Sequence, residues 1–157
     1  IIHMPLNLNI KYPVVSNSWE VREFTLKELF SFSDKTLLYF YPRDNTPGCT
    51  VENKDFSVLL PAYEKKWITL IGVSKDSIES HKKFIAWQNL DIDLISDTDL
   101  VLHKELWAYG EKNNYGKIVT GVIRSTFLFD KQGNILQQWK NVRAKWHAAK
   151  VFREIER

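Results

Sequence analysis

The sequence predicts an α/β protein with a central mixed sheet flanked by helices. Two continuous apolar runs of strand length, Leu37–Tyr41 and Trp67–Val73, are typical of strands that are covered on both faces. A helical pattern separates these two runs. Two further runs, Ile123–Phe129 and Ile135–Trp139, flank the sequence K-Q-G-N, which is typical of a hairpin turn with Gly133 at positive φ. Strands that alternate with helices and then form a hairpin indicate a mixed sheet between helical layers.

The composition is that of one globular domain, and we expect it to span residues 1–157. Of its 157 residues, 44% are hydrophobic and 13% are aromatic, which is enough for a sizeable core. The net charge is only +3, and the charged residues are interleaved, so the charge does not indicate a nucleic-acid partner. No apolar run has the length of a membrane span. A single cysteine cannot form an internal disulfide, which favours a reducing, cytoplasmic setting.

The N-terminal region carries the weakest patterns. We expect Met4 to be the natural start, with residues 1–3 as additions, and a removed leader stays open. Apolar residues between Val14 and Phe24, with Trp19 among them, suggest an early hairpin. A short helix, Leu26–Phe30, should follow, with Thr25 and Glu28 as its capping box.

The middle of the chain alternates helices and strands. One helix face after residue 49 is formed by Phe56, Leu59, Leu60 and Tyr63, and Pro61 interrupts it, so two short helices or a kink are expected. Asp76 and Glu79 should cap a helix from Ser77 to about Asn89, with Ile78 and Ile85 buried.

The second half begins with a short strand, Ile92–Ile95, and a helix, Leu100–Trp107, that Asp97-Thr98-Asp99 should open. The polar segment Tyr109–Thr120 contains two glycines and is expected to be a loop. The final helix should cover about Lys145–Glu156 and bury one face, formed by Ala148, Val151, Phe152 and Ile155.

Cys49, the only cysteine, is the strongest candidate for chemistry. It should lie in the first turn of a helix, directly after a loop punctuated by Pro42, Asn45, Pro47 and Gly48. Unpaired backbone N–H groups and the helix dipole favour an anion there, and such settings lower the pKa of a cysteine. The alternative interpretation is an inert buried thiol, which is common for free cysteines.

The residues around Cys49 carry a family resemblance. The stretch Y-F-Y-P-R-D-N-T-P-G-C-T, Tyr39–Thr50, resembles the active-site loop of the peroxiredoxins, and within them of the peroxiredoxin Q subfamily, also called bacterioferritin comigratory proteins. The block G-V-I-R-S-T-F-L around Arg124 resembles the second motif of that family, and S-I-E-S-H-K-K-F, Ser77–Phe84, lies between the two. The resemblance runs from Leu37 to the C-terminus. It implies a thioredoxin-like fold and a thiol-dependent peroxidase that reduces hydrogen peroxide and small alkyl hydroperoxides.

Peroxide reduction requires a thiolate, donors for the departing oxygen and shelter from water. Cys49 is the expected nucleophile and would become a sulfenic acid. The Thr46 hydroxyl would donate to the thiolate or the peroxide, and Pro42, which has no N–H, would act as an apolar lid. The resemblance assigns Arg124 as the guanidinium that reaches the sulfur. Glu52 would orient Arg124, and a solvated glutamate of the first helical turn is the other interpretation.

The sequence departs from the subfamily at Lys54. Many peroxiredoxin Q proteins have a second cysteine five residues after the first, and Lys54 occupies that position. An external thiol, such as glutathione, a glutaredoxin or a thioredoxin, is therefore expected to resolve the sulfenic acid. The expected protein is a monomer or weak dimer without a cofactor.

Several other functions were weighed against this one. The four histidines, His3, His81, His103 and His147, share no metal-ligand spacing, and His81 and His103 are expected on helix surfaces. Arg43 is interpreted as a rim residue. A cysteine hydrolase lacks an identifiable histidine base, a cysteine phosphatase lacks its downstream arginine, and a disulfide reductase lacks C-x-x-C.

Two alternatives rest on other features of the chain. Trp139 and Trp146 lie near four lysines and arginines, but no clustered basic stripe indicates nucleic-acid binding. Core packing is expected for Trp87 and Trp107, and lining the approach to the site is the other possibility. The serious alternative function is a thioredoxin-like redox sensor whose Cys49 oxidises reversibly with little turnover.

Overall fold

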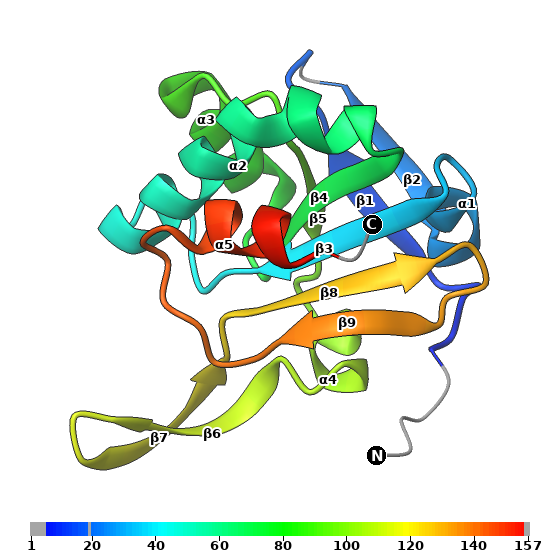
Figure 1. Ribbon diagram of the computed structural model, residues 1–157. Helices are drawn as coiled ribbons and strands as arrows, with labels where there is room; N and C mark the ends of the chain where they lie inside the picture. The colour runs from blue at the N-terminus through cyan, green and yellow to red at the C-terminus, as the bar shows by residue number, and fades with distance from the viewer. Residues whose placement is uncertain (1–5, 19, 156–157) are drawn as a thin grey trace.

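A seven-stranded mixed sheet forms the centre of the computed structural model, which describes residues 6–18 and 20–155 (Figure 1). The strand order is β2-β1-β5-β4-β3-β8-β9. Strands β3, β4 and β5 run parallel, while β1 and β8 pair antiparallel with β5 and β3. The predicted α/β class with a central mixed sheet is confirmed. The strands are β1 (Lys11–Val15), β2 (Val21–Thr25), β3 (Lys35–Phe40), β4 (Ile68–Ser74), β5 (Asp93–Ser96), β8 (Ser125–Asp130) and β9 (Ile135–Trp139).

Helices cover both faces of this sheet. Residues of α2, α3 and α5 join one buried cluster with Tyr39, and residues of α1 and α4 join a second cluster with Phe40. Strand β3 contributes side chains to both clusters, because successive side chains of a strand point to opposite faces of the sheet. The apolar run of the sequence is thus explained by burial on two sides. The helices are α1 (Leu26–Phe30), α2 (Pro47–Lys65), α3 (Ile78–Gln88), α4 (Val101–Glu105) and α5 (His147–Glu154).

Strand β4 has a glycine where it passes the ring of Tyr39. A Cβ placed on Gly72 would lie 2.8 Å from the Tyr39 hydroxyl oxygen and 2.7 Å from a methyl carbon of Leu94. The space left by this glycine admits the Tyr39 ring, whose hydroxyl donates to Asn53 Oδ1 at 2.6 Å. Asn53 in turn donates to the carbonyl of Cys49 at 2.9 Å, so the sheet is tied to the first turns of α2.

Several predicted elements are confirmed. Strands β1 and β2 form the early hairpin, although Trp19 lies outside the described residues. Thr25 and Glu28 form the predicted capping box of α1. Strands β8 and β9 pair antiparallel, and Gly133 has a φ of +87° in their turn.

Other predicted boundaries shift by one or two residues. Strand β5 begins at Asp93 rather than Ile92. Helix α4 is confined to five residues, since Leu100 and Trp107 both have positive φ. The final helix begins at His147 rather than Lys145, because Trp146 adopts a left-handed conformation, with φ at +63°. On its predicted buried face, Phe152 stays partly exposed.

Of the two outcomes predicted around Pro61, two short helices or a kink, the first is wrong. Helix α2 is continuous from Pro47 to Lys65, and Pro61 lies on its exposed side. Just beyond Pro61, the Tyr63 hydroxyl donates to the Ala148 carbonyl at 2.9 Å, so this end of α2 is held against α5.

The predicted cap of α3 is also wrong. Ser77 is the N-cap, and its hydroxyl accepts from the Ser80 N–H. The Asp76 carboxylate instead accepts from the Asp44 N–H at 2.9 Å and from the Ser74 hydroxyl at 2.6 Å. The expected burial of Ile85 is confirmed, and Ile78 is partly buried.

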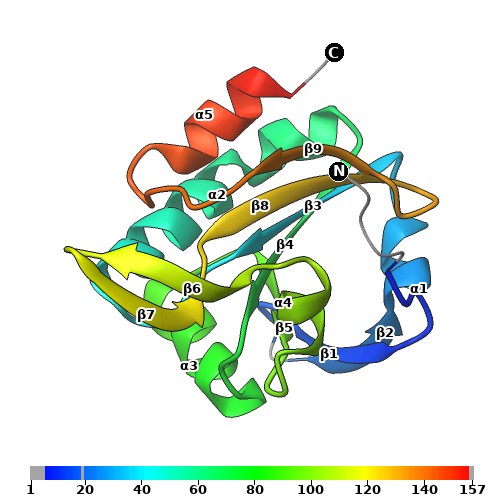
Figure 2. The same ribbon diagram turned by 90° about the horizontal axis from the view of Figure 1, so that it is seen from below.

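The segment predicted as a loop is instead a hairpin. Strands β6 (Tyr109–Asn114) and β7 (Lys117–Val122) pair with each other and project from the body of the molecule (Figure 2). Tyr115 and Gly116 both have positive φ, as a tight two-residue turn requires. Most residues of this β6–β7 hairpin face solvent, so its sequence lacks the alternation of apolar and polar residues that would indicate a strand.

Burial reverses expectations for several aromatic and imidazole side chains. His81 and His103, expected on helix surfaces, are both 0% exposed, and each bonds an aspartate. Trp87 and Trp107, expected in the core, are 69% and 54% exposed. Trp67 begins no strand: it is exposed, with φ at +61°, directly before β4. The local sequence did not separate the buried from the exposed side chains in α3 and α4, because polar and apolar residues are mixed along both helices.

Candidate active site

The loop between β3 and α2 delivers Cys49 to the carboxyl end of the central strands. Pairing of β3 with β4 continues to Tyr41, whose N–H donates to the Val73 carbonyl at 3.1 Å. The chain then turns, with Asn45 at a φ of +58°, and α2 begins at Pro47, a residue favoured in the first helical turn. Cys49 therefore lies in the first turn of a long helix, as predicted, where the helix dipole favours an anion.

Cys49 meets a guanidinium in this position. Its side chain is buried, with 1% exposure, and Arg124 Nη2 lies 3.4 Å from Cys49 Sγ. Arg124 directly precedes β8, which pairs antiparallel with β3, so the sheet brings these two residues together across 75 positions of sequence. A fixed guanidinium beside a sulfur stabilises the thiolate and can also donate to an oxygen bound there.

Glu52 completes a cluster of three residues with Cys49 and Arg124, of which Cys49 and Glu52 are buried. The Glu52 carboxylate is 0% exposed and accepts from Arg124 Nη1 through Oε1, while Oε2 has no partner among the described residues. Burial raises the pKa of Glu52 to about 7, against the opposing effect of Arg124. Burial lowers the pKa of Arg124, but the nearby Glu52 and Cys49 outweigh it, and the net shift is upward. Arg124 therefore stays charged and is oriented from one side by Glu52.

Thr46 and Pro42 lie on the same loop without touching the sulfur through a hydrogen bond. The Thr46 hydroxyl donates to the Arg43 carbonyl at 2.9 Å, and Thr46 is the N-cap of α2 with no side-chain bond to the first turn. Pro42 is half-buried directly after Tyr41. Rotation about the Thr46 χ1 bond would redirect its hydroxyl, so the two residues remain candidates for contact with a bound peroxide.

A polar network that sequence reasoning missed supports the loop from beneath. Asp44 is 6% exposed, and its carboxylate accepts from three groups: the Tyr41 hydroxyl at 2.6 Å, the Ser80 hydroxyl at 2.8 Å and His81 Nδ1 at 2.8 Å. The other His81 nitrogen, Nε2, faces the Ile95 carbonyl at 2.9 Å. Both ring nitrogens of His81 therefore lie within hydrogen-bond distance of an oxygen. We call these four residues, Tyr41, Asp44, Ser80 and His81, the Asp44 network.

One sequence signal pointed to this network. The block S-I-E-S-H-K-K-F contains both Ser80 and His81. In the structure, these two residues of α3 hydrogen-bond to Asp44 of the active-site loop. Its partner Asp44 lies 37 residues from His81, which no local pattern reveals.

The Asp44 network also includes groups that could hold a metal ion together with Asp76. Ligand atoms of Asp44, Asp76 and His81 lie within 4.8 Å of one another. Hydrogen bonds from Tyr41, Ser74 and Ser80 already occupy the carboxylates, so this geometry suits a hydrogen-bonded network.

His147 borders the site at the start of α5. Its Nε2 lies 2.7 Å from the Thr126 hydroxyl, which belongs to β8 two residues after Arg124. Burial, with the positive charges of Arg124 and Lys150, lowers the pKa of His147 to about 4. A neutral His147 at physiological pH is a structural link between α5 and β8.

Comparison with known proteins fits this geometry. The model of the AhpC/TSA family matches residues 9–138. The chain belongs to the AhpC/TSA family. A peroxiredoxin Bcp from Xanthomonas campestris is 45% identical over 116 residues, covering 74% of this chain and 72% of that protein. Another, from Bacillus subtilis, is 39% identical over 120 residues and 76% of each chain.

Solved structures agree with these sequence matches. The bacterioferritin comigratory protein of Xanthomonas campestris, studied for its alkyl peroxide reduction activity, has a TM-score of 0.82 at 34% identity, over 97% of this chain and 94% of its own. The predicted resemblance to peroxiredoxins of the Q or Bcp type, and with it the thioredoxin-like fold, is confirmed. Within the described residues of this AhpC/TSA member, no helix is both long and apolar enough to cross a membrane.

Proposed function

We propose that this protein is a thiol-dependent peroxidase that reduces hydrogen peroxide and small alkyl hydroperoxides at Cys49. The observation that carries the proposal is the 3.4 Å approach of Arg124 Nη2 to Cys49 Sγ in the first turn of α2. The alkyl peroxide reduction activity named for the Xanthomonas campestris protein supports the same substrate class.

The reaction follows from the groups at the site. The Cys49 thiolate attacks the terminal peroxide oxygen in line with the O–O bond, so that an S–O bond forms as the O–O bond breaks. Cys49 is oxidised to a sulfenic acid, and the peroxide is reduced to water or an alcohol after its leaving oxygen takes up a proton. Arg124 stabilises both the thiolate and the negative charge on that oxygen. Glu52 orients Arg124, Thr46 donates to the peroxide and Pro42 shields it from water.

Return to the thiol requires an external reductant, since Cys49 is the only cysteine. Lys54, at the usual resolving position, is exposed on α2 and cannot form a disulfide. A first thiol attacks the sulfenic sulfur and releases water, and a second thiol reduces the mixed disulfide. Glutathione, a glutaredoxin or a thioredoxin can supply these thiols in a reducing compartment such as the cytoplasm.

Stopped-flow tryptophan fluorescence tests the first half of the cycle. Reduced protein is mixed with hydrogen peroxide, and mass spectrometry follows the product, with Cys49→Ser as the control. The expected result is a change in fluorescence that adds one oxygen to Cys49 and disappears in the control. A rate no greater than that of a free thiol would contradict the peroxidase.

A redox sensor is the second candidate. Cys49 is 1% exposed and has no resolving partner in the chain, so its sulfenic acid could persist. Steady-state consumption of peroxide with added thiol favours the enzyme. A single turnover that stops at the sulfenic acid, whichever thiol is added, favours the sensor.

A further inference from the structure

The end of the chain gathers positive charge that the peroxide chemistry does not use. Residues 140–153 contain five lysines and arginines and no aspartate or glutamate. Because the net charge of the whole chain is only +3, the rest of the chain is net negative. The five cations, Lys140, Arg143, Lys145, Lys150 and Arg153, line a hollow of about 500 Å³ at the start of α5. We call this concavity the basic hollow.

Four of these cations have no acidic partner among residues 6–18 and 20–155. Within the described part of the chain, Arg143, Lys145, Lys150 and Arg153 form no ion pair with a carboxylate. The fifth, Lys140, donates instead to the Trp107 carbonyl at 3.0 Å. Uncompensated cations around a concavity raise the local concentration of anions.

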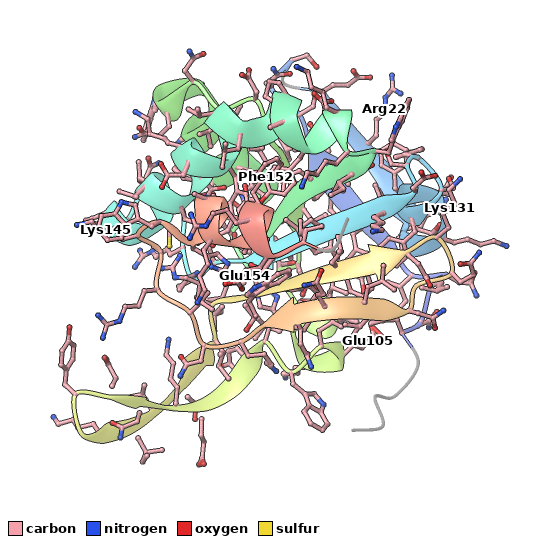
Figure 3. All side chains as sticks on the ribbon, in the orientation of Figure 1. Arg22, Glu105, Lys131, Lys145, Phe152 and Glu154 are labelled. Atoms are coloured by element: carbon pink, nitrogen blue, oxygen red, sulfur yellow. The ribbon has the colours of Figure 1, made fainter. Side chains whose placement is uncertain are left out.

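The basic hollow adjoins the active site. The loop that lines it holds Val142, whose N–H donates to the Arg124 carbonyl at 3.0 Å, and Ala144, whose Cβ would lie 3.6 Å from a Cβ placed on Gly48. Gly48 directly precedes Cys49. Lys145 extends beside the beginning of α2 in Figure 3, at the end of the molecule opposite Lys131.

We propose that the basic hollow binds a small anionic thiol, a carboxylate-bearing peptide of the glutathione type, and presents it to oxidised Cys49. This inference rests on the proposed function and names its reductant. The volume suits a ligand of that size, and small-molecule sites are concave with a few placed charges. The lysines and arginines bind the carboxylates and leave the thiol free.

The chemistry of the bound thiol balances as follows. Its thiolate attacks the sulfenic sulfur of Cys49, an S–S bond forms, and the sulfenic oxygen leaves as water after protonation. A second molecule of the same thiol attacks the mixed disulfide, which releases the Cys49 thiolate and the oxidised thiol dimer. Because Cys49 is buried, the first turn of α2 must open for the attack, and the absence of a side-chain bond from Thr46 to that turn leaves it weakly held.

The test separates reduction from oxidation. Protein oxidised with one equivalent of peroxide is mixed with glutathione or with the neutral thiol 2-mercaptoethanol, and recovery of tryptophan fluorescence is followed. We expect the double substitution Arg143→Glu with Lys145→Glu to slow reduction by glutathione about tenfold or more, with the neutral thiol unaffected. The matched control Lys131→Glu, a charge reversal at the far end, should change neither rate.

Binding can also be measured without any reaction. Reduced protein titrated with S-methylglutathione, which cannot attack sulfur, should bind in the hollow and lose affinity in the double variant and in high salt. Equal slowing of both thiols, or none, would overturn the inference. Slowing only of a thioredoxin-fold reductant would assign the hollow to a protein instead. If wild-type Cys49 failed to gain oxygen from peroxide, the proposed function would fail first, and mass spectrometry before thiol addition shows this separately.

Discussion

Two hydrogen-bonded pairs of a basic and an acidic side chain flank the active-site loop, and the two pairs differ in what they contact. Arg124 and Glu52 lie beside Cys49, and the guanidinium contacts its sulfur. The side chains of His81 and Asp44 are more completely buried than that of Arg124, but their contacts are Tyr41, Ser80 and the Ile95 carbonyl. The first pair can act on charge at the sulfur, while the second fixes the backbone from which α2 begins. Burial and pairing alone therefore do not identify the groups that act on a substrate.

The largest expected effect follows from Arg124→Lys. Lysine keeps the charge but loses the planar fork that reaches Glu52 with one nitrogen and Cys49 with the other. The rate constant for oxidation by hydrogen peroxide should fall about 10²- to 10³-fold, as when a transition-state donor is removed. Stopped-flow fluorescence measures this rate constant. Arg43→Lys, a change of the exposed loop arginine, is the control. Equal rate constants for the two variants would show that Arg124 takes no part in the reaction.

Breaking the second pair should affect folding first and activity second. Asp44→Ala removes the acceptor of three hydrogen bonds and should destabilise the protein by about 3–5 kcal/mol, as expected when one partner of a buried pair is lost. A displaced loop should also slow oxidation of Cys49, by about tenfold or more.

Asp44→Asn distinguishes shape from charge. Its amide can accept from the Tyr41 hydroxyl and keep a hydrogen bond to His81 Nδ1, so both the stability and the rate should stay near those of the wild type. Urea unfolding and stopped flow measure the two quantities. An Asn variant as slow as the Ala variant would show that the Asp44 charge acts on the reaction directly.

The third prediction uses a matched pair of histidines. His103 also bonds an aspartate, since Asp97 Oδ2 accepts from its Nδ1 at 2.7 Å, but this contact spans only six residues and lies at the entry to α4. His81→Gln and His103→Gln should each cost about 1–3 kcal/mol of stability, because each disturbs buried hydrogen bonds. Only His81→Gln should lower the rate of peroxide oxidation. Equal loss of rate in both would mean that the Asp44 network has no special coupling to the loop.

These comparisons show what could be predicted from the sequence. Strand β3, the position of Cys49 and the choice of Arg124 followed from apolar runs and from two motif blocks. The β6–β7 hairpin did not, because its exposed side chains carry no periodicity. The burial of His81 was also missed, because a polar residue is buried only when its partners are nearby, and Asp44 comes from a distant part of the chain. The burial of His103 was missed although its partner, Asp97, is only six residues away. Local sequence patterns predict which apolar side chains are buried, but they do not predict the burial of a polar side chain that is hydrogen-bonded within the folded protein.

The smallest effect on activity is expected at Glu52, and it is best seen as a pH dependence of stability. Because burial raises its pKa to about 7, the folded protein retains a proton that the unfolded chain, with an ordinary value of 4.5, has released. Stability therefore falls as pH rises from about 4.5 to about 7, and this contribution is constant above that window. Glu52→Gln removes it. The variant, compared with the wild type by urea unfolding, should gain up to about 3 kcal/mol between these two pH values.

The difference in unfolding free energy between the wild type and Glu52→Gln reports the ionisation of the Glu52 carboxyl alone. His147, whose pKa is lowered to about 4, contributes stability that is lost as pH falls below about 6.5, and it does so in both proteins. If the difference in stability between Glu52→Gln and the wild type instead stayed constant from pH 4.5 to 7, and shifted towards the variant only as pH fell below 4.5, Glu52 would be ionised in the folded protein throughout that range. In that case Arg124 would outweigh burial, and the pair beside Cys49 would be a full ion pair at every pH at which the enzyme works.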